Sequence, residues 1–297
     1  MTRKTVSPPS RRDLARWTGA GLIAGAAVGL PGSSSAQTPS TGNVVRNGRI
    51  RQSACKWCYP RQSLAELAQA GRDMGLQSIE LVDPKDFPVL IEHGLQCAMV
   101  NTHPLTRGLA HPDEHEYCIE RVLASIDAAA EAGFPSVITF SGLRKGMEDE
   151  QGLRNSVEAL GKILPRAEAK GINVCMELLN SKVDHPGYMC DRTEWGFELV
   201  EKVGSERFKL LYDIYHMQIM EGDVIRTITE NLDKIGHFHT AGVPGRHELD
   251  ETQELFYPAI VRAIVDGGYE GYLGQEFIPT GDDPIGSLRG AVALCDV

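Results

Sequence analysis

The chain has 297 residues, of which 42% are hydrophobic, 24% charged and 6% aromatic. This composition is typical of a globular protein and excludes a disordered, collagen-like or disulfide-scaffold chain. The net charge is −10 and the pI is about 5.4, with the positive charges scattered along the sequence. These values argue against nucleic acid as a partner.

The first 36 residues differ from the rest of the chain. Arg11-Arg12 precedes the uncharged stretch Trp17 to Leu30, and the small residues Ser34-Ser35-Ala36 follow. This pattern predicts a twin-arginine-type export signal over residues 1–36 and a periplasmic protein. The uncharged run of 14 residues is shorter than the roughly 18 that span a bilayer, so an uncleaved anchor is the weaker alternative. Without the signal the net charge would be −14, because five basic residues and one acid are lost.

The remaining chain predicts one large domain. Residues 37–50, rich in Ser, Thr, Gly and Asn, predict a flexible lead-in, and residues 51–297 suffice for a substantial core. The seven cysteines are an odd number, and several lie in apolar runs where Cys acts as a small hydrophobe. Cys55 and Cys58 have redox-motif spacing without a thioredoxin-like context. A redox role is therefore the weaker interpretation, and a disulfide between them is left open.

Helix-like segments and short β-rich runs alternate along this domain. Five helix-like segments end at Gly, which suits the left-handed position after a helix. These glycines are Gly75, Gly94, Gly133, Gly171 and Gly267-Gly268. Ser63 and Glu66 match a capping box at the start of one segment. Apolar residues recur at helical spacing over 113–131 and 153–164, which predicts amphipathic helices.

Eight strands are expected between these helices. They are Ala54 to Cys58, Ser78 to Val82, Cys97 to Asn101, Ser136 to Phe140, Asn173 to Leu178, Lys209 to Asp213, Ile235 to Thr240 and Tyr272 to Phe277. Alternation with helices implies parallel βαβ units. Eight units without a Gly-rich dinucleotide fingerprint favour an α/β fold of the (β/α)8 TIM barrel type, with its active face at the strand-to-helix junctions.

The last four predicted strands end in strong metal ligands. These are Glu177, Asp213, His239 and Glu276. A single carboxylate at a strand end often caps the next helix. Several carboxylates that converge at one barrel mouth are costly to desolvate unless a cation neutralises them. Three carboxylates and one imidazole predict a single divalent ion, Mn²⁺ or Mg²⁺, with Zn²⁺ or Co²⁺ also compatible.

These four residues resemble the metal quartet of the xylose-isomerase-like TIM barrels, which include the ketose 3-epimerases. Four segments resemble the hydroxypyruvate isomerase family more closely, and the likeness runs from about residue 50 to the C-terminus. They are Gln52 to Tyr59, Glu80 to Pro84, Glu177 to Asn180 and Ala241 to Glu248, the last being the most specific. Hydroxypyruvate isomerases typically place Gln where this chain has His239, as the epimerases do. The substitution leaves the metal site intact and puts the substrate in question.

The resemblance implies an enzyme that moves a carbonyl between adjacent carbons through an enediolate. A metal stabilises the enediolate as a Lewis acid, and Glu177 and Glu276 shuttle the proton while also ligating the metal. His216 would lie on the first turn after Asp213 and face the substrate, where the epimerases also have His.

Substrate contacts are predicted less specifically. Arg246 and His247 are candidates to hold a substrate carboxylate, and Trp57 to form an apolar wall. Weaker candidates on other loops are Asn180, Lys182, His185 and His103.

The predicted function is therefore isomerisation of hydroxypyruvate to 2-hydroxy-3-oxopropanoate or of a related small keto-hydroxy acid. Alternatives are a ketose 3-epimerase or keto-polyol dehydratase, favoured by His239, and an exported sugar-acid binding protein without turnover. An endonuclease-IV-like enzyme would need further His ligands and a basic DNA-binding face. The expected partner is a small molecule, without nucleic acid or stable membrane insertion, and a homo-oligomer is left open.

Overall fold

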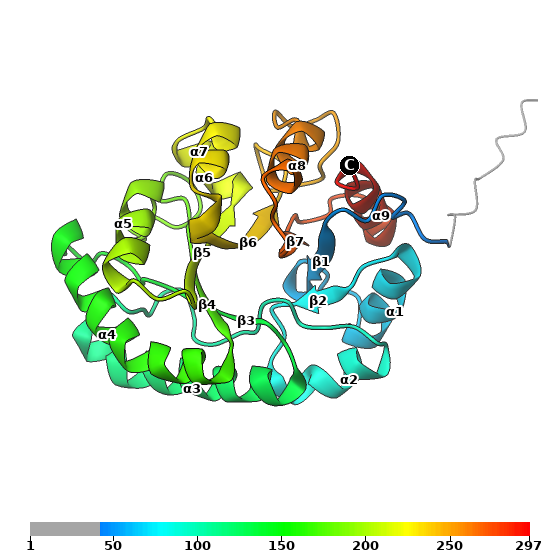
Figure 1. Ribbon diagram of the computed structural model, residues 1–297. Helices are drawn as coiled ribbons and strands as arrows, with labels where there is room; N and C mark the ends of the chain where they lie inside the picture. The colour runs from blue at the N-terminus through cyan, green and yellow to red at the C-terminus, as the bar shows by residue number, and fades with distance from the viewer. Residues whose placement is uncertain (1–41) are drawn as a thin grey trace, which may run out of the picture. The chain divides into compact units, whose positions relative to one another are not determined.

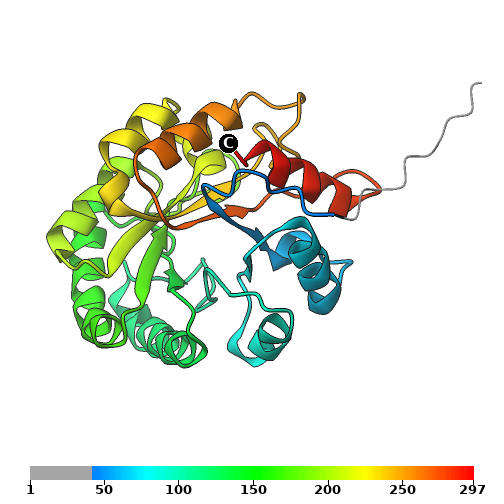
Figure 2. The same cartoon turned by 45° about the vertical axis from the view of Figure 1, so that its right-hand side comes forward.

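The computed structural model describes residues 42–297. The predicted signal, residues 1–36, and the first part of the lead-in lie outside the described residues. From residue 42 the lead-in is tied to the end of the chain (Figure 2): the Asp296 carboxylate accepts hydrogen bonds of 2.8 Å from the N–H groups of Asn47 and Gly48. The Val44 N–H donates to the Met74 carbonyl at 3.0 Å. Residues 42–50 are therefore held by the domain, unlike the predicted flexible segment.

The described strands form one parallel sheet of seven strands, in the order β2-β1-β7-β6-β5-β4-β3. Their bounds are β1 Arg51–Cys55, β2 Ser78–Glu80, β3 Ser136–Thr139, β4 Asn173–Glu177, β5 Phe208–Asp213, β6 Ile235–Thr240 and β7 Tyr272–Gln275. The predicted strand Cys97 to Asn101 makes only isolated bridges, from Val100 to Val82 and to Val137. A further bridge joins Gln96 to Ser78 of β2. The segment therefore lies between β2 and β3 and closes the ring as one of eight strand positions. The predicted (β/α)8 barrel is confirmed.

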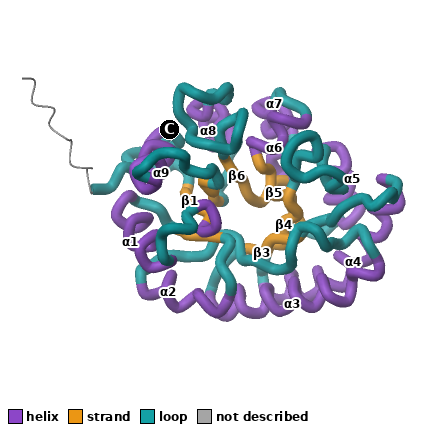
Figure 3. The backbone as a smooth tube through the Cα atoms, turned by 180° about the vertical axis from the view of Figure 1, so that it is seen from behind, coloured by secondary structure: helices purple, strands orange, loops and turns teal. Residues whose placement is uncertain are grey.

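Helices surround the strands on the outside of the ring (Figures 1 and 3). They are α1 Leu64–Met74, α2 Phe87–Glu92, α3 His115–Ala132, α4 Asp149–Lys170, α5 Thr193–Val203, α6 Ile214–Met220, α7 Val224–Glu230, α8 Tyr257–Asp266 and α9 Pro284–Leu294. The capping box at the start of α1 is present, with the Ser63 hydroxyl accepting the Glu66 N–H at 3.2 Å. The predicted apolar stripe of α3 is buried at Val122 and Ile126. The apolar face of α3 therefore packs against the barrel, as the spacing of its apolar residues predicted.

Buried charged residues, among them Glu177, Asp213 and Glu276, lie where the strands end. Because every strand pairing is parallel, the carboxyl ends of the strands share one mouth. All seven cysteines are free and buried, so Cys55 and Cys58 form no disulfide. No helix within residues 42–297 is long and apolar enough to cross a membrane.

Candidate active site

The structure brings the four predicted metal-ligating residues together. Glu177 ends β4, Asp213 ends β5, His239 is the penultimate residue of β6, and Glu276 follows β7. Parallel pairing sets Asp213 directly beside His239. One ligand atom from each of the four lies within 4.8 Å of all the others, and all four side chains are buried.

Two buried atoms of this cluster have no hydrogen-bond partner in the described part of the chain. They are Glu177 Oε1 and His239 Nδ1. His239 Nδ1 lies 2.9 Å from Glu276 Oε2 and 3.5 Å from Glu177 Oε1, without the alignment of a hydrogen bond. Buried polar atoms are normally paired, so unpaired acceptors that face one another suggest a shared cation. The donor set of three carboxylates and one imidazole fits a divalent ion.

The pKa values of the carboxyl groups diverge. Burial raises the pKa of Asp213 to about 8 and also raises that of Glu177. Burial opposes ionisation of Glu276 as well, but the positive charges of His239 and Arg246 hold the pKa of Glu276 well below its usual range. Burial would lower the pKa of His239, yet the surrounding acidic groups, Glu276 foremost, raise it well above its ordinary value. In the metal-free site the pKa values of Glu177 and Glu276 are thus shifted in opposite directions.

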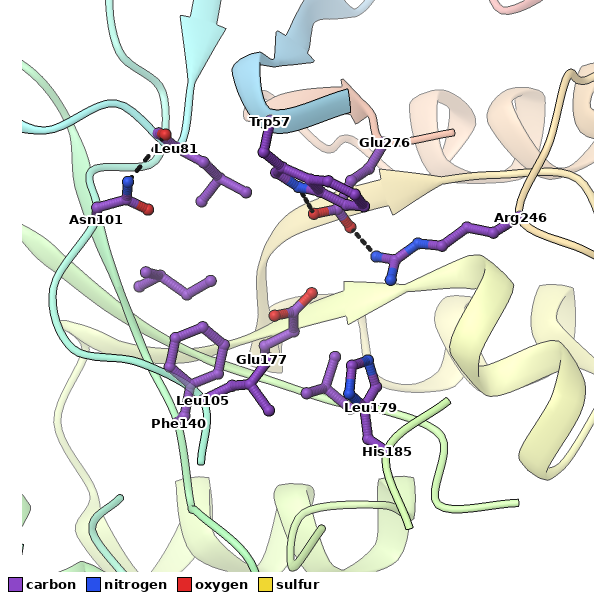
Figure 4. Close-up of a pocket in the computed structure, with 11 residues that line it drawn as sticks. Trp57, Leu81, Asn101, Leu105, Phe140, Glu177, Leu179, His185, Arg246 and Glu276 are labelled. Carbon is purple, nitrogen blue, oxygen red and sulfur yellow. Dashed lines mark hydrogen bonds and ion pairs between the residues drawn. The ribbon is translucent and has the colours of Figure 1, made fainter. Parts of the chain in front are cut away.

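Arg246 reaches into this cluster from the loop after β6. Its backbone has a φ of +62°, and its Nη2 atom lies 2.5 Å from Glu276 Oε2 and 3.4 Å from Asp213 Oδ2. The indole N–H of Trp57 donates to Glu276 Oε1 at 2.8 Å, and the guanidinium stands 5.1 Å from the centre of the Trp57 ring system. Figure 4 shows both side chains turned toward Glu276. Arg246 thus contacts protein carboxylates at the edge of the cavity.

A cavity of about 370 Å³ opens beside these residues (Figure 4). Its charged and polar side is formed by Trp57, Glu177, His185, Arg246 and Glu276. Its other side is mostly apolar, with Leu81, Leu105, Ile138, Phe140 and Leu179 beside the polar Asn101. A ligand here would meet two carboxylates and a guanidinium at one end and hydrocarbon at the other.

His216 and Asn180 lie behind the cluster. The Asp213 carboxylate caps α6 by accepting the His216 N–H at 3.1 Å, so Asp213 also has the helix-capping role common at strand ends. The Asn180 amide donates to His216 Nδ1 at 2.6 Å, which leaves His216 Nε2 3.5 Å from Asp213. His216 is fully buried and is not among the residues that line the cavity. His216 Nε2 has no hydrogen-bond partner among the described residues, and a role of His216 toward the substrate stays a prediction.

The remaining predicted contacts separate into one cavity residue and three others. His185 lines the cavity and packs edge-on against His216, with ring centres 5.3 Å apart. His247 is exposed and its Nδ1 lies 3.1 Å from the Ile278 carbonyl oxygen, so it points away from the site. Lys182 donates to the carbonyls of the last turn of α6. His103 is buried against Thr139 at 3.0 Å.

Sequence reasoning missed a second layer behind His239. Glu80 accepts a hydrogen bond from His239 Nε2 at 2.7 Å and one from His237 Nε2 at 2.9 Å. Cys55 Sγ lies 3.5 Å from the same Glu80 oxygen. Part of the signal was present in the sequence, because His237 shares the inward face of β6 with His239 as strand side chains alternate. The end of β2 at Glu80, two residues before the predicted end, is seen only in the structure.

The fold and the site define a barrel enzyme with a carboxylate-rich centre at the strand ends. Residues 68–292 match the model of the xylose isomerase-like TIM barrel family. The chain is 31% identical over 229 residues to 2-oxo-tetronate isomerase of Cupriavidus necator, covering 73% of this chain and 87% of the relative. It is 33% identical over 218 residues to hydroxypyruvate isomerase of Escherichia coli K12, which covers 69% of this chain and 84% of the relative. A crystal structure described as AP endonuclease, family 2, from Brucella melitensis superposes with a TM-score of 0.73 at 25% identity. The match covers 82% of this chain and 97% of that structure.

The chain therefore belongs to the xylose isomerase-like TIM barrel family, in the branch that contains the hydroxypyruvate isomerases. The predicted family and the prediction of an isomerase enzyme are confirmed. The predicted periplasmic location is wrong on the comparison with the relatives, which include hydroxypyruvate isomerase of E. coli K12 and a human protein named putative hydroxypyruvate isomerase. The arginine pair that suggested export lies outside the described residues.

Proposed function

We propose that this enzyme interconverts hydroxypyruvate and 2-hydroxy-3-oxopropanoate, or a closely related small keto-hydroxy acid, by metal-dependent proton transfer. The observation that carries the proposal is the placement of two buried glutamates, Glu177 and Glu276, on one wall of the cavity beside a divalent-ion donor set. The names of the relatives support the same substrate class.

Glu177, Asp213, His239 and Glu276 would hold the ion, with Mn²⁺ or Mg²⁺ best suited to an oxygen-rich set. The bound ion would supply Lewis-acid stabilisation of charge on the substrate oxygens. Arg246 adds a fixed positive charge at the same wall and also keeps Glu276 ionised.

Glu276 and Glu177 both line the cavity and are the proposed proton carriers. Glu276, which lies beside Arg246, would take the proton from the hydroxymethyl carbon, which leaves an enediolate. Glu177 would return a proton to the neighbouring carbon through the carboxylate oxygen that does not ligate the ion. One proton leaves a carbon and one is returned to the adjacent carbon, while the hydroxymethyl oxygen loses its proton and the former carbonyl oxygen gains one. The reaction is therefore a net isomerisation with no external oxidant or reductant.

The cavity wall favours a short acid over a sugar. A ketose would place several hydroxyl groups against Leu105, Ile138 and Phe140, where they would lose hydrogen bonds to water without replacement. A ketose 3-epimerase or keto-polyol dehydratase is the second candidate, because His239 stands where the epimerases have His. A binding protein without turnover would gain little from two carboxylates beside an anionic ligand.

The test is to incubate the purified chain with Mn²⁺ and hydroxypyruvate and to follow the mixture by NMR. We expect 2-hydroxy-3-oxopropanoate to form, and its formation to stop when the metal is chelated. D-fructose, offered under the same conditions, should remain unchanged. Turnover of D-fructose without turnover of hydroxypyruvate would replace the proposal with the epimerase.

A further inference from the structure

A fully buried carboxylate, Glu80, lies behind His239 on the side away from the cavity. Its Oε1 atom is 2.7 Å from His239 Nε2 and 2.9 Å from His237 Nε2. A carboxylate accepts hydrogen bonds, so the His239 Nε2 atom must carry the hydrogen. In the neutral ring the lone pair is then on Nδ1, the atom that faces Glu177 and Glu276. Glu80 thus presents the ligating nitrogen of His239 to the metal site.

The neighbouring strand makes room for this contact. Gly274 on β7 pairs with His239, and a Cβ atom built on Gly274 would lie 2.4 Å from Glu80 Oε1 and 2.8 Å from His239 Cδ2. The backbone of Gly274 does not have a positive φ, so the glycine is needed here for space rather than for its conformational freedom. Any larger residue at 274 would push the Glu80 carboxylate off the imidazole.

We propose that Glu80 is a positioning residue that fixes the ring and the tautomer of His239 and thereby raises the affinity of the site for its divalent ion. His237 holds the same Glu80 oxygen from the other side, which keeps the carboxylate in place. The inference rests on the metal site of the proposed function. Partners that orient metal-bound histidines typically contribute about 10- to 100-fold in metal affinity.

The experiment compares Mn²⁺ binding to the full chain, freed of metal by chelation, by isothermal titration calorimetry. Glu80→Gln keeps the size of the side chain and removes its charge. Gly274→Ala crowds both the Glu80 carboxylate and the His239 ring without changing the chemistry of either side chain. Glu158→Gln is the matched control, because it makes the same exchange at an exposed pair with Lys162 on α4. Asp213→Ala removes a proposed ligand outright.

We expect Glu80→Gln and Gly274→Ala each to weaken Mn²⁺ binding by about 10- to 100-fold, and Glu158→Gln to leave it unchanged. The visible absorption of the Co²⁺-loaded protein should shift in the first two variants, a change that a purely structural role would not produce. If Glu80→Gln fails to fold, Glu80→Asp, which keeps the charge and withdraws it from His239 Nε2, decides. An unchanged Mn²⁺ affinity in the folded variants, together with loss of binding in Asp213→Ala, would overturn the role of Glu80 alone. Wild-type affinity in Asp213→Ala would instead overturn the metal site itself.

Discussion

Replacing Glu276 by Gln tests the proposed base most sharply, because Gln keeps the shape of the side chain. The amide oxygen can still accept the Trp57 N–H, which is 2.8 Å from Glu276 Oε1. The charge that Arg246 and His239 stabilise at 2.5 and 2.9 Å is lost, and the amide cannot take a proton. A general base contributes about 10²- to 10⁴-fold, which corresponds to about 3 to 5 kcal/mol of transition-state stabilisation. We therefore expect kcat to fall by at least about 10²-fold.

The assay measures the initial rate of hydroxypyruvate conversion by NMR at saturating Mn²⁺. Bound metal is measured in the same samples by elemental analysis, so that loss of the ion is separated from loss of the base. Glu158→Gln, an identical exchange on the surface of α4, should retain the full rate. A Glu276→Gln protein that keeps its metal and turns over near the wild-type rate would refute Glu276 as the base.

Three further predictions follow from the same contacts. Asp213→Ala should lose bound metal and the thermal stabilisation that metal gives, since ligands that bind only the folded state raise its stability; a metal content equal to wild type would contradict this. Arg246→Met should lower kcat/KM for hydroxypyruvate by tenfold or more, because a hydrogen bond to a charged group contributes about 1.5–3 kcal/mol, and an unchanged value would remove Arg246 from the site. The melting temperature of the metal-free protein should fall from pH 7 to pH 8, above the range in which the buried histidines with lowered pKa values, such as His216, add stability as the pH rises. The pKa of Asp213 is raised to about 8 in the folded state, so the folded form binds more protons in this range and loses stability as they leave. Asp213→Asn should flatten that slope, and an equal slope in both proteins would exclude Asp213 as its source.

The barrel could be predicted because its local signals agree with the fold. The helix ends, the capping box at Ser63 and the strand β6, expected over 235–240 and found there, all follow from short-range chemistry. Once the strands are parallel, their carboxyl ends must meet, so Glu177, Asp213, His239 and Glu276 could be grouped without coordinates. The predicted strand Cys97 to Asn101 is weaker than its pattern suggested, because it makes only isolated bridges.

The direction of side chains on loops could not be predicted in this way. Arg246 and His247 are neighbours, yet the positive φ of Arg246 lets its side chain reach the carboxylates while His247 turns outward. The contact of Glu80 with His239 depends on the space at Gly274, which is visible only when three strands are packed. The tie between Asn47 and Asp296 likewise joins residues 249 positions apart. Such long-range contacts leave no periodic signal in the sequence.

The most direct test of proton transfer is the reaction of hydroxypyruvate in D₂O with the wild-type enzyme and Mn²⁺, followed by NMR. A proton held by Glu177 or Glu276 exchanges with solvent, so we predict deuterium on the carbon that receives the proton in 2-hydroxy-3-oxopropanoate. The hydroxymethyl carbon of recovered hydroxypyruvate should also gain deuterium during the reverse reaction. Product that forms while retaining all of its original carbon-bound hydrogen would contradict the enediolate and the two glutamates as its proton carriers.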